Sequence, residues 1–203
     1  MFELIRADLA RKMRAYGVRP EDKTFFRKRI TPFLEFGTFA VIVYRFGSWA
    51  YTVKIPIIRQ ILITLYLFIN VACMAITGIH IQSETKIGPG LVIHNFCGIL
   101  VLAKEIGHSC TLNQGVSIMN VRGVGRATIG DNVYFAAGSQ VVGGVTIGDN
   151  VVVSVNSVVL NDVPSGATVL GNPARVISRA ATSPYLKAPV IPVPSTTPAT
   201  TAL

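Results

Sequence analysis

The chain has 203 residues, of which 50% are hydrophobic and 14% charged, so it is not a disordered protein and can hold one medium domain or a compact body with a helical attachment. The formal net charge of +9 is concentrated near the N-terminus, without the interleaved aromatics or helix-turn-helix pattern of a nucleic-acid-binding protein. Nucleic acid is therefore not expected as a partner. Three cysteines without a CxxC pattern favour neither a disulfide framework nor a zinc site, so we expect a reduced, cytoplasmic protein without a metal.

Residues 1–78 are predicted to form a helical N-terminal segment. Its first part is polar and basic, with apolar residues at helical spacing. Its second part contains an uncharged run, Gln60 to Ile79, that is long enough to cross a bilayer. Against a membrane span, Thr64 and Asn70 lie inside the run and Gly78 ends it directly before the next region.

Two other interpretations of the apolar run remain open. A helix packed on the protein body or in a subunit interface would also be apolar on all sides, and we favour this interpretation. Peripheral contact with the inner face of a membrane is an intermediate possibility, in which Arg45, Lys54 and Arg59 would flank the membrane-facing surface.

Residues 79–179 change to short β-rich pieces with an apolar residue at every sixth position. A period of six predicts a β-helix with three short faces per coil and about five coils, each burying its interior by stacking on its neighbours. The remaining residues, 180–203, are rich in Pro and Thr and are predicted to form a disordered tail. The apolar positions of the repeat are Ile81, Ile87, Ile93, Ile106, Leu112, Ile118, Ile129, Phe135, Val141, Ile147, Val153 and Val159.

The IGDN corners and the closing segment NDVPSGATVLGNPARVI resemble the hexapeptide-repeat acyltransferases, in particular the serine acetyltransferase-like branch. The resemblance implies a mainly β fold, a left-handed parallel β-helix preceded by an α-helical segment. It also implies acetyl-CoA as the acyl donor and a homotrimer with the CoA groove between neighbouring β-helices.

A general base is needed to take the proton of the attacking hydroxyl, and imidazole suits this role near neutral pH. The segment GLVIHNFCGI resembles the family's GLxIxHxxGI, which carries the catalytic histidine. Counted from Gly90, that histidine falls on Asn95, whereas counted back from Ile106 it falls on His94. We expect His94 to be the catalytic base and Asn95 to contact the substrate.

The acid that orients the family's histidine is missing here. The segment HIQSETKIG stands where the family has DIHPxAKIG, so His80 replaces the acid, and the nearest carboxylate is Glu84. Either His80 pairs with His94, as a second catalytic residue, or His94 works with a backbone carbonyl alone. His108 is interpreted as a solvated turn residue.

The segment 119–127 interrupts the period and is predicted to protrude as a loop. By resemblance such a loop closes the acceptor channel, so its arginines, Arg122 and Arg126, are candidate contacts for an anionic acceptor or for CoA phosphates. The resemblance also implies a CoA site on the late coils, made by Ala137, Gly138, Gly143, Asn156 and Arg175.

The leading functional prediction is an O-acetyltransferase acting on a sugar hydroxyl in exopolysaccharide or glycoconjugate synthesis. The alternatives are a serine O-acetyltransferase of cysteine synthesis and a non-catalytic trimeric scaffold.

Overall fold

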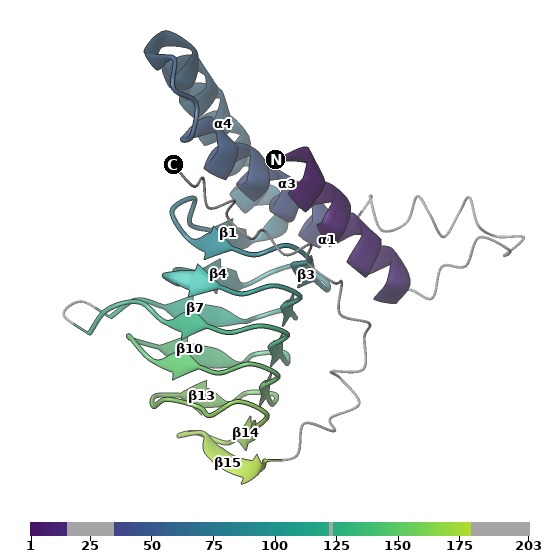
Figure 1. Cartoon of the computed structure of the whole chain (residues 1–203), viewed down its shortest axis with the longest axis vertical. Coiled ribbons are helices and arrows are strands. Elements are labelled where there is room, and N and C mark those ends of the chain that lie inside the picture. Colours follow the sequence, from purple (N-terminus) through teal and green to yellow (C-terminus); the bar gives the residue numbers. More distant parts are fainter. Residues whose placement is uncertain (16–34, 122–123, 180–203) are drawn as a thin grey trace, which may run out of the picture.

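The computed structural model describes residues 1–15, 35–121 and 124–179, and the predicted tail at 180–203 lies outside them. A stack of β-coils carries helices at one end (Figure 1). The helices are α1 (Phe2–Ala15), α3 (Phe36–Ala50) and α4 (Pro56–Thr77). The strands are β1 (Ile79–Ile81), β2 (Lys86–Ile87), β3 (Val92–Ile93), β4 (Ile99–Val101), β5 (Glu105–Ile106), β6 (Thr111–Leu112), β7 (Ser117–Met119), β8 (Thr128–Ile129), β9 (Tyr134–Phe135), β10 (Gln140–Val142), β11 (Thr146–Ile147), β12 (Val152–Val153), β13 (Val158–Val159), β14 (Thr168–Leu170) and β15 (Arg175–Ser178).

Three sheets form the faces of the β-helix. The first sheet has the order β1-β4-β7-β10-β13, the second β2-β5-β8-β11, and the third β3-β6-β9-β12-β14-β15. Up to β13, strands three apart in the chain are hydrogen-bonded neighbours, and β14 then pairs with β12. The pairing is parallel except for β15, which is antiparallel to β14. This confirms the predicted parallel β-helix of about five coils.

The interior of the β-helix is a column of the apolar residues predicted from the period of six. Ile93, Leu112 and Phe135 pair in consecutive strands of the third sheet and are at most 1% exposed. The corners carry residues with positive φ, such as Asn132 and Asn150, where a short polar side chain tolerates the left-handed region. The sequence pattern therefore follows directly from one inward side chain per face.

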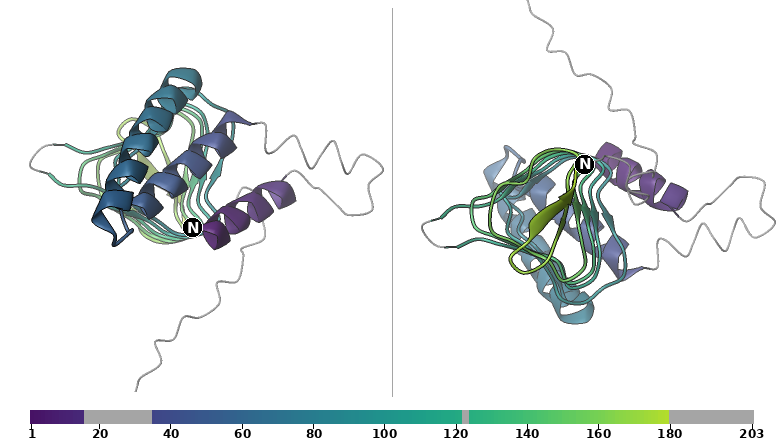
Figure 2. Two further views of the ribbon diagram at one scale, coloured as in Figure 1. Left: turned by 90° about the horizontal axis from the view of Figure 1, so that it is seen from above. Right: turned by 90° about the horizontal axis from the view of Figure 1, so that it is seen from below.

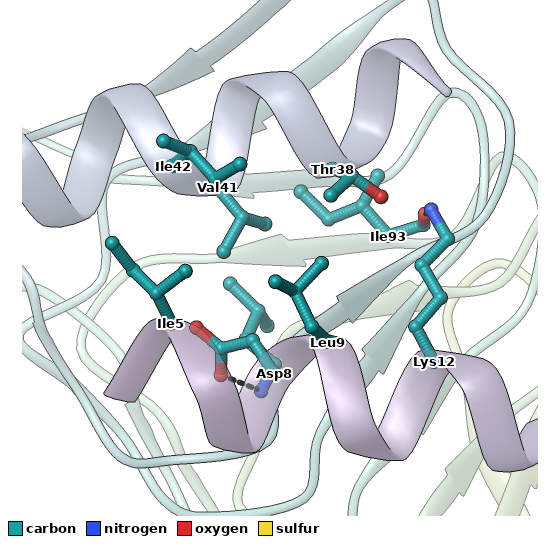
Figure 3. A pocket seen from close by; sticks show the side chains of 9 residues that line it. Ile5, Asp8, Leu9, Lys12, Thr38, Val41, Ile42 and Ile93 are labelled. Atoms are coloured by element: carbon teal, nitrogen blue, oxygen red, sulfur yellow. Dashed lines mark hydrogen bonds between the residues drawn. The ribbon is translucent and has the colours of Figure 1, made fainter. Parts of the chain in front are cut away.

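The helices cover one end of the coil stack, as seen from above in Figure 2. Between α1, α3 and β3 lies a small apolar contact region that includes Ile5, Leu9, Val41 and Ile93 (Figure 3). At Gly37 a Cβ would lie 2.6 Å from the carbonyl oxygen of Ile93, so α3 begins in close contact with the first coil. The helices thus close the apolar interior of the first coil, which has no preceding coil to stack on.

Buried charged side chains hold the helices against the first coil. The Asp8 carboxylate accepts hydrogen bonds from the backbone N–H groups of Gly90 and Leu91, at 2.7 and 2.8 Å, and pairs with Arg45 at 2.9 Å. Arg45 also donates to the carbonyl oxygens of Ile87 and Gly88 at 2.6 Å. The suggestion that Arg45 flanks a membrane-facing surface is therefore wrong, because its guanidinium is buried against the β-helix.

Two more basic residues, both in α1, bind backbone carbonyls of the first coils. Arg11 donates to the carbonyl oxygens of Gly90 and Cys110, at 2.9 and 2.8 Å, and Lys12 donates to that of Ile93 at 2.9 Å. Part of the basic N-terminal cluster is thus internal, and it satisfies backbone carbonyls that would otherwise be buried without a partner.

Helix α4 differs from α1 and α3 because most of its surface is exposed. It packs on α3 through Tyr66, whose ring lies against Gly47, and it ends at Gly78, whose φ of 64° reverses the chain into β1. In length and composition α4 resembles a membrane span, and 17% of its most apolar window is buried inside the protein.

Candidate functional site

At the corner between the third and first sheets, equivalent residues of successive coils lie next to one another and are joined by backbone hydrogen bonds. The N–H of Gly115 donates to the Cys97 carbonyl at 3.1 Å, and the N–H of Gly138 donates to that of Gln114 at 2.9 Å. One coil further, Asn156 N–H donates to the Ala137 carbonyl at 3.0 Å. These bonds make the corner a continuous column, which we call the corner column (residues 94–98, 113–116, 136–139 and 154–157).

A groove runs along the corner column and the adjoining third sheet. It has a volume of roughly 400 Å³ and is lined by backbone and small or polar side chains of four coils. The lining residues are Asn95, Asn113, Gln114, Tyr134, Ala136, Ala137, Val152, Ser154 and Val155. An elongated, open groove with few charges suits an extended ligand that is held mainly by backbone contacts.

His94 stands at the start of the corner column, directly after β3, and is half-buried beside α1. Its backbone N–H donates to the Leu112 carbonyl at 2.9 Å, which fixes the position of the residue. Burial lowers the pKa of His94, and the nearby charges of Lys12 and Arg11 act in the same direction, against the opposing effect of Glu35. The imidazole is therefore held neutral at neutral pH, the form that a base requires.

Asn95 faces the groove. Its φ is 64°, its side chain is exposed, and its amide nitrogen donates to the Gln114 side chain at 2.8 Å. A slip of one residue exchanges the faces of two neighbours. The sequence left open whether the family's histidine position falls on His94 or on Asn95. In the structure these two residues have different surroundings, since His94 lies beside α1 and Asn95 lines the groove.

A second hollow adjoins the same corner. It is lined by Glu35, Phe36, Asn95 and Phe96, and the rings of Phe36 and Phe96 meet edge to face at 4.9 Å. Glu35 forms an ion pair with Lys12 at 2.6 Å. Asn95 therefore borders both an elongated groove and a smaller hollow that contains a carboxylate.

The other two histidines lie elsewhere in the first coils. His80 is in β1, where its Nδ1 is 3.1 Å from the sulfur of Met74 in α4. His108 lies in a turn after β5, with Nε2 2.9 Å from the Asp131 carboxylate. His94 and His80 thus come from the third and first faces of the coil, and a role of His80 beside His94 stays a prediction.

The residues predicted to bind acceptor and CoA are distributed over several faces. Ala137 lines the groove, and Gly138 lies beside it with its Cα facing the Asn156 side chain. Gly143 lies on another corner, against Val124 of the interrupting loop.

The predicted arginines lie apart from the groove or outside the described part of the chain. Arg126 pairs with Glu84 at 3.2 Å, and Arg175 is exposed in β15 at the far end of the β-helix. Arg122 lies outside the described residues.

Sequence reasoning missed most of the polar lining of the groove. Asn113, Gln114, Tyr134 and Ser154 line it together with Asn95. The repeat itself indicates these residues, because equivalent positions of successive coils lie next to one another. An alignment of the coils places Gln114 directly beside Asn95.

The fold and the repeat define the class of protein. Residues 126–161 match the family of bacterial transferase hexapeptide (six repeats), and these residues form the regular late coils. These late coils thus carry the hexapeptide repeat of that family, and the chain as a whole resembles the serine acetyltransferase-like acyltransferases.

Serine acetyltransferases are among the proteins that the chain resembles. The chain is 34% identical over 144 residues to the serine acetyltransferase of Synechococcus elongatus, a match that covers 69% of this chain and 56% of the relative. It resembles the crystal structure of serine acetyltransferase from Neisseria gonorrhoeae in complex with serine, with a TM-score of 0.71, 25% identity, and coverage of 87% of this chain and 69% of the other. A serine acetyltransferase in complex with CoA gives a TM-score of 0.68, 26% identity, and coverage of 86% and 70%.

These comparisons correct the predicted acceptor. The sequence favoured a sugar hydroxyl in exopolysaccharide synthesis, whereas the curated relative and the similar structures are serine acetyltransferases. The prediction relied in part on the missing acid, which the overall similarity outweighs.

Proposed function

We propose that this protein is an acetyl-CoA-dependent serine O-acetyltransferase. The observation that carries the proposal is the 34% identity to a serine acetyltransferase over 144 residues. The chain spans 56% of the length of that relative, so the activity of the whole relative is a proposal for this chain.

The reaction transfers an acetyl group from sulfur to oxygen. The serine hydroxyl oxygen attacks the thioester carbonyl, the new C–O bond forms, and the C–S bond breaks to release CoA. The base takes the hydroxyl proton and returns it to the departing thiolate. The lowered pKa of His94 supports it as this base, because the imidazole is neutral at the working pH.

Asn95 is proposed as a substrate contact at the same corner. Its side-chain amide can donate a hydrogen bond to the oxyanion that develops on the thioester carbonyl.

The groove is proposed to hold the pantetheine arm of acetyl-CoA. Its elongated shape and its lining of Ala136, Ala137 and Ser154 support a ligand that is bound mainly through backbone groups. We further propose a homotrimer in which a neighbouring copy closes the open side of the groove, as symmetric rings of this type allow.

The test is a thiol-release assay on the purified full chain with acetyl-CoA and L-serine. We expect release with serine, and its loss in His94→Ala, with His108→Ala as a matched control that retains activity. If Asn95→Ala abolishes turnover and His94→Ala does not, the base is not His94. Absence of both CoA binding and thiol release would contradict the proposal and favour a scaffold.

A further inference from the structure

The outer surface of α4 is apolar, and no other residue in the described part of the chain packs on it. Three side chains, Tyr66, Cys73 and Thr77, are the buried part of this helix. The opposite face carries large apolar side chains, with Phe68 73% exposed. The exposed apolar residues of α4 are Ile57, Ile58, Ile61, Leu65, Leu67, Phe68, Val71, Met74 and Ile76.

The charges around this face have one sign. Residues 36–83 contain no aspartate or glutamate, and their three basic residues are Arg45, Lys54 and Arg59. Arg45 is buried against Asp8, whereas Lys54 and Arg59 are exposed next to the start of α4. Trp49 and Tyr51 are exposed at the same end, and such amphipathic rings favour the boundary between lipid and water.

The attachment of the hairpin formed by α3 and α4 argues against a helix that crosses the bilayer. Tyr44 donates to the Thr85 carbonyl at 2.5 Å, and Arg45 binds the carbonyls of Ile87 and Gly88, so α3 is fixed to the first coil. Helix α4 packs along α3 and continues directly into β1. Insertion across a membrane would carry α3 and its buried ion pair with Asp8 into lipid, whereas flat contact leaves both in place.

We propose that α4 and the connection 51–55 form a peripheral binding surface for an anionic membrane. The apolar face enters the boundary between headgroups and acyl chains, and Lys54 and Arg59 pair with lipid phosphates. The helical cap lies on the membrane, and the coil stack extends away from it, so the groove along the corner column stays in water (Figure 1).

Flotation of the full chain with lipid vesicles tests this surface. We expect binding to vesicles of phosphatidylcholine mixed with phosphatidylglycerol, and weaker, salt-insensitive binding to phosphatidylcholine alone. The double variant Leu65→Glu, Phe68→Glu should weaken binding about tenfold or more, because charged groups replace buried apolar ones. Leu160→Glu is the matched control, since Leu160 is 48% and Leu65 49% exposed, and it should bind like the unchanged protein.

A second pair of variants tests the charge. Lys54→Gln with Arg59→Gln should reduce binding to the anionic vesicles by about fivefold for each charge removed, while Lys104→Gln leaves it unchanged. Circular dichroism checks that each variant is folded.

The proposal is overturned if the unchanged protein does not float with either vesicle, or if both sets of variants float as it does. It is also overturned if light scattering shows that Leu65→Glu, Phe68→Glu breaks a larger assembly whose formation, and not lipid, covers the face.

Discussion

The environment of His94 combines burial with two positive charges. Each makes the imidazolium less favourable, which lowers the pKa of His94 below that of a free imidazole. A base with a lowered pKa loses its activity only when the pH falls through that lower value. The acidic limb of the rate profile should therefore lie below the ordinary pKa of histidine.

Lys12 provides a direct test of this environment. Lys12→Gln removes a positive charge near His94 while keeping a hydrogen-bond donor for the Ile93 carbonyl. We expect the pKa of His94 to rise, measured by the pH dependence of its ring proton signals in NMR. Lys104→Gln, on an exposed site before β5, should leave it unchanged. An unchanged pKa in Lys12→Gln would contradict the electrostatic account.

The three cysteines differ sharply in accessibility. Burial raises the pKa of Cys110 to about 12 and also raises that of Cys73, whereas Cys97 is exposed in the corner column. Because the thiolate is the reactive form, iodoacetamide should label Cys97 alone in the folded protein. Mass spectrometry of digested protein checks this, with Cys97→Ser as the variant that should remain unlabelled until it is unfolded.

At the scale of elements, α1 is held by polar contacts more than by its apolar face. Asp8 accepts two backbone N–H groups and the Arg45 guanidinium at a buried position. Asp8→Ala leaves these donors and the charge of Arg45 without a partner, which should lower the free energy of unfolding by about 3–5 kcal/mol. Urea denaturation measures the loss, and Glu3→Ala, an exposed acid of the same helix, should have little effect.

The same contacts explain which elements could be predicted from the sequence. The β-helix follows from a period that one inward side chain per face imposes, so its strands were predictable. The docking of α1 was not, because Arg11, Lys12 and Asp8 read as a solvated polar face. Their partners are backbone carbonyls and N–H groups of the first coils, and a sequence does not distinguish these from any other backbone group.

The candidate site, too, could be predicted only in part from the sequence. His94 and Asn95 were identified from their resemblance to a motif, and both lie at the corner column. Their different surroundings could not be predicted, since one residue of register separates the environment beside α1 from the groove. The Glu35 hollow also depends on tertiary contact, because Glu35 and Phe36 precede the repeat and reach the corner only when α3 packs on it.

At the scale of the whole molecule, the interior is one continuous apolar column. Phe135 is fully buried in the third coil, between Leu112 and Val153 of the neighbouring coils. Phe135→Ala should destabilise the protein by about 3–5 kcal/mol, since it removes a large side chain from a column that cannot collapse around the void. Thermal unfolding followed by circular dichroism measures this. Leu160→Ala, which truncates an exposed side chain, should change the midpoint little, and an equal effect of both changes would contradict the account.

The two ends of the coil stack are closed by different devices, helices at the first coil and the antiparallel β15 at the last. Neither device depends on how many coils lie between them. A duplicated coil of three hexapeptides could therefore be accommodated between β10 and β13, and it would lengthen the molecule by about 4.8 Å, the spacing of neighbouring strands. The corner column and the groove beside it would lengthen by the same step, so the number of coils sets the length of the groove.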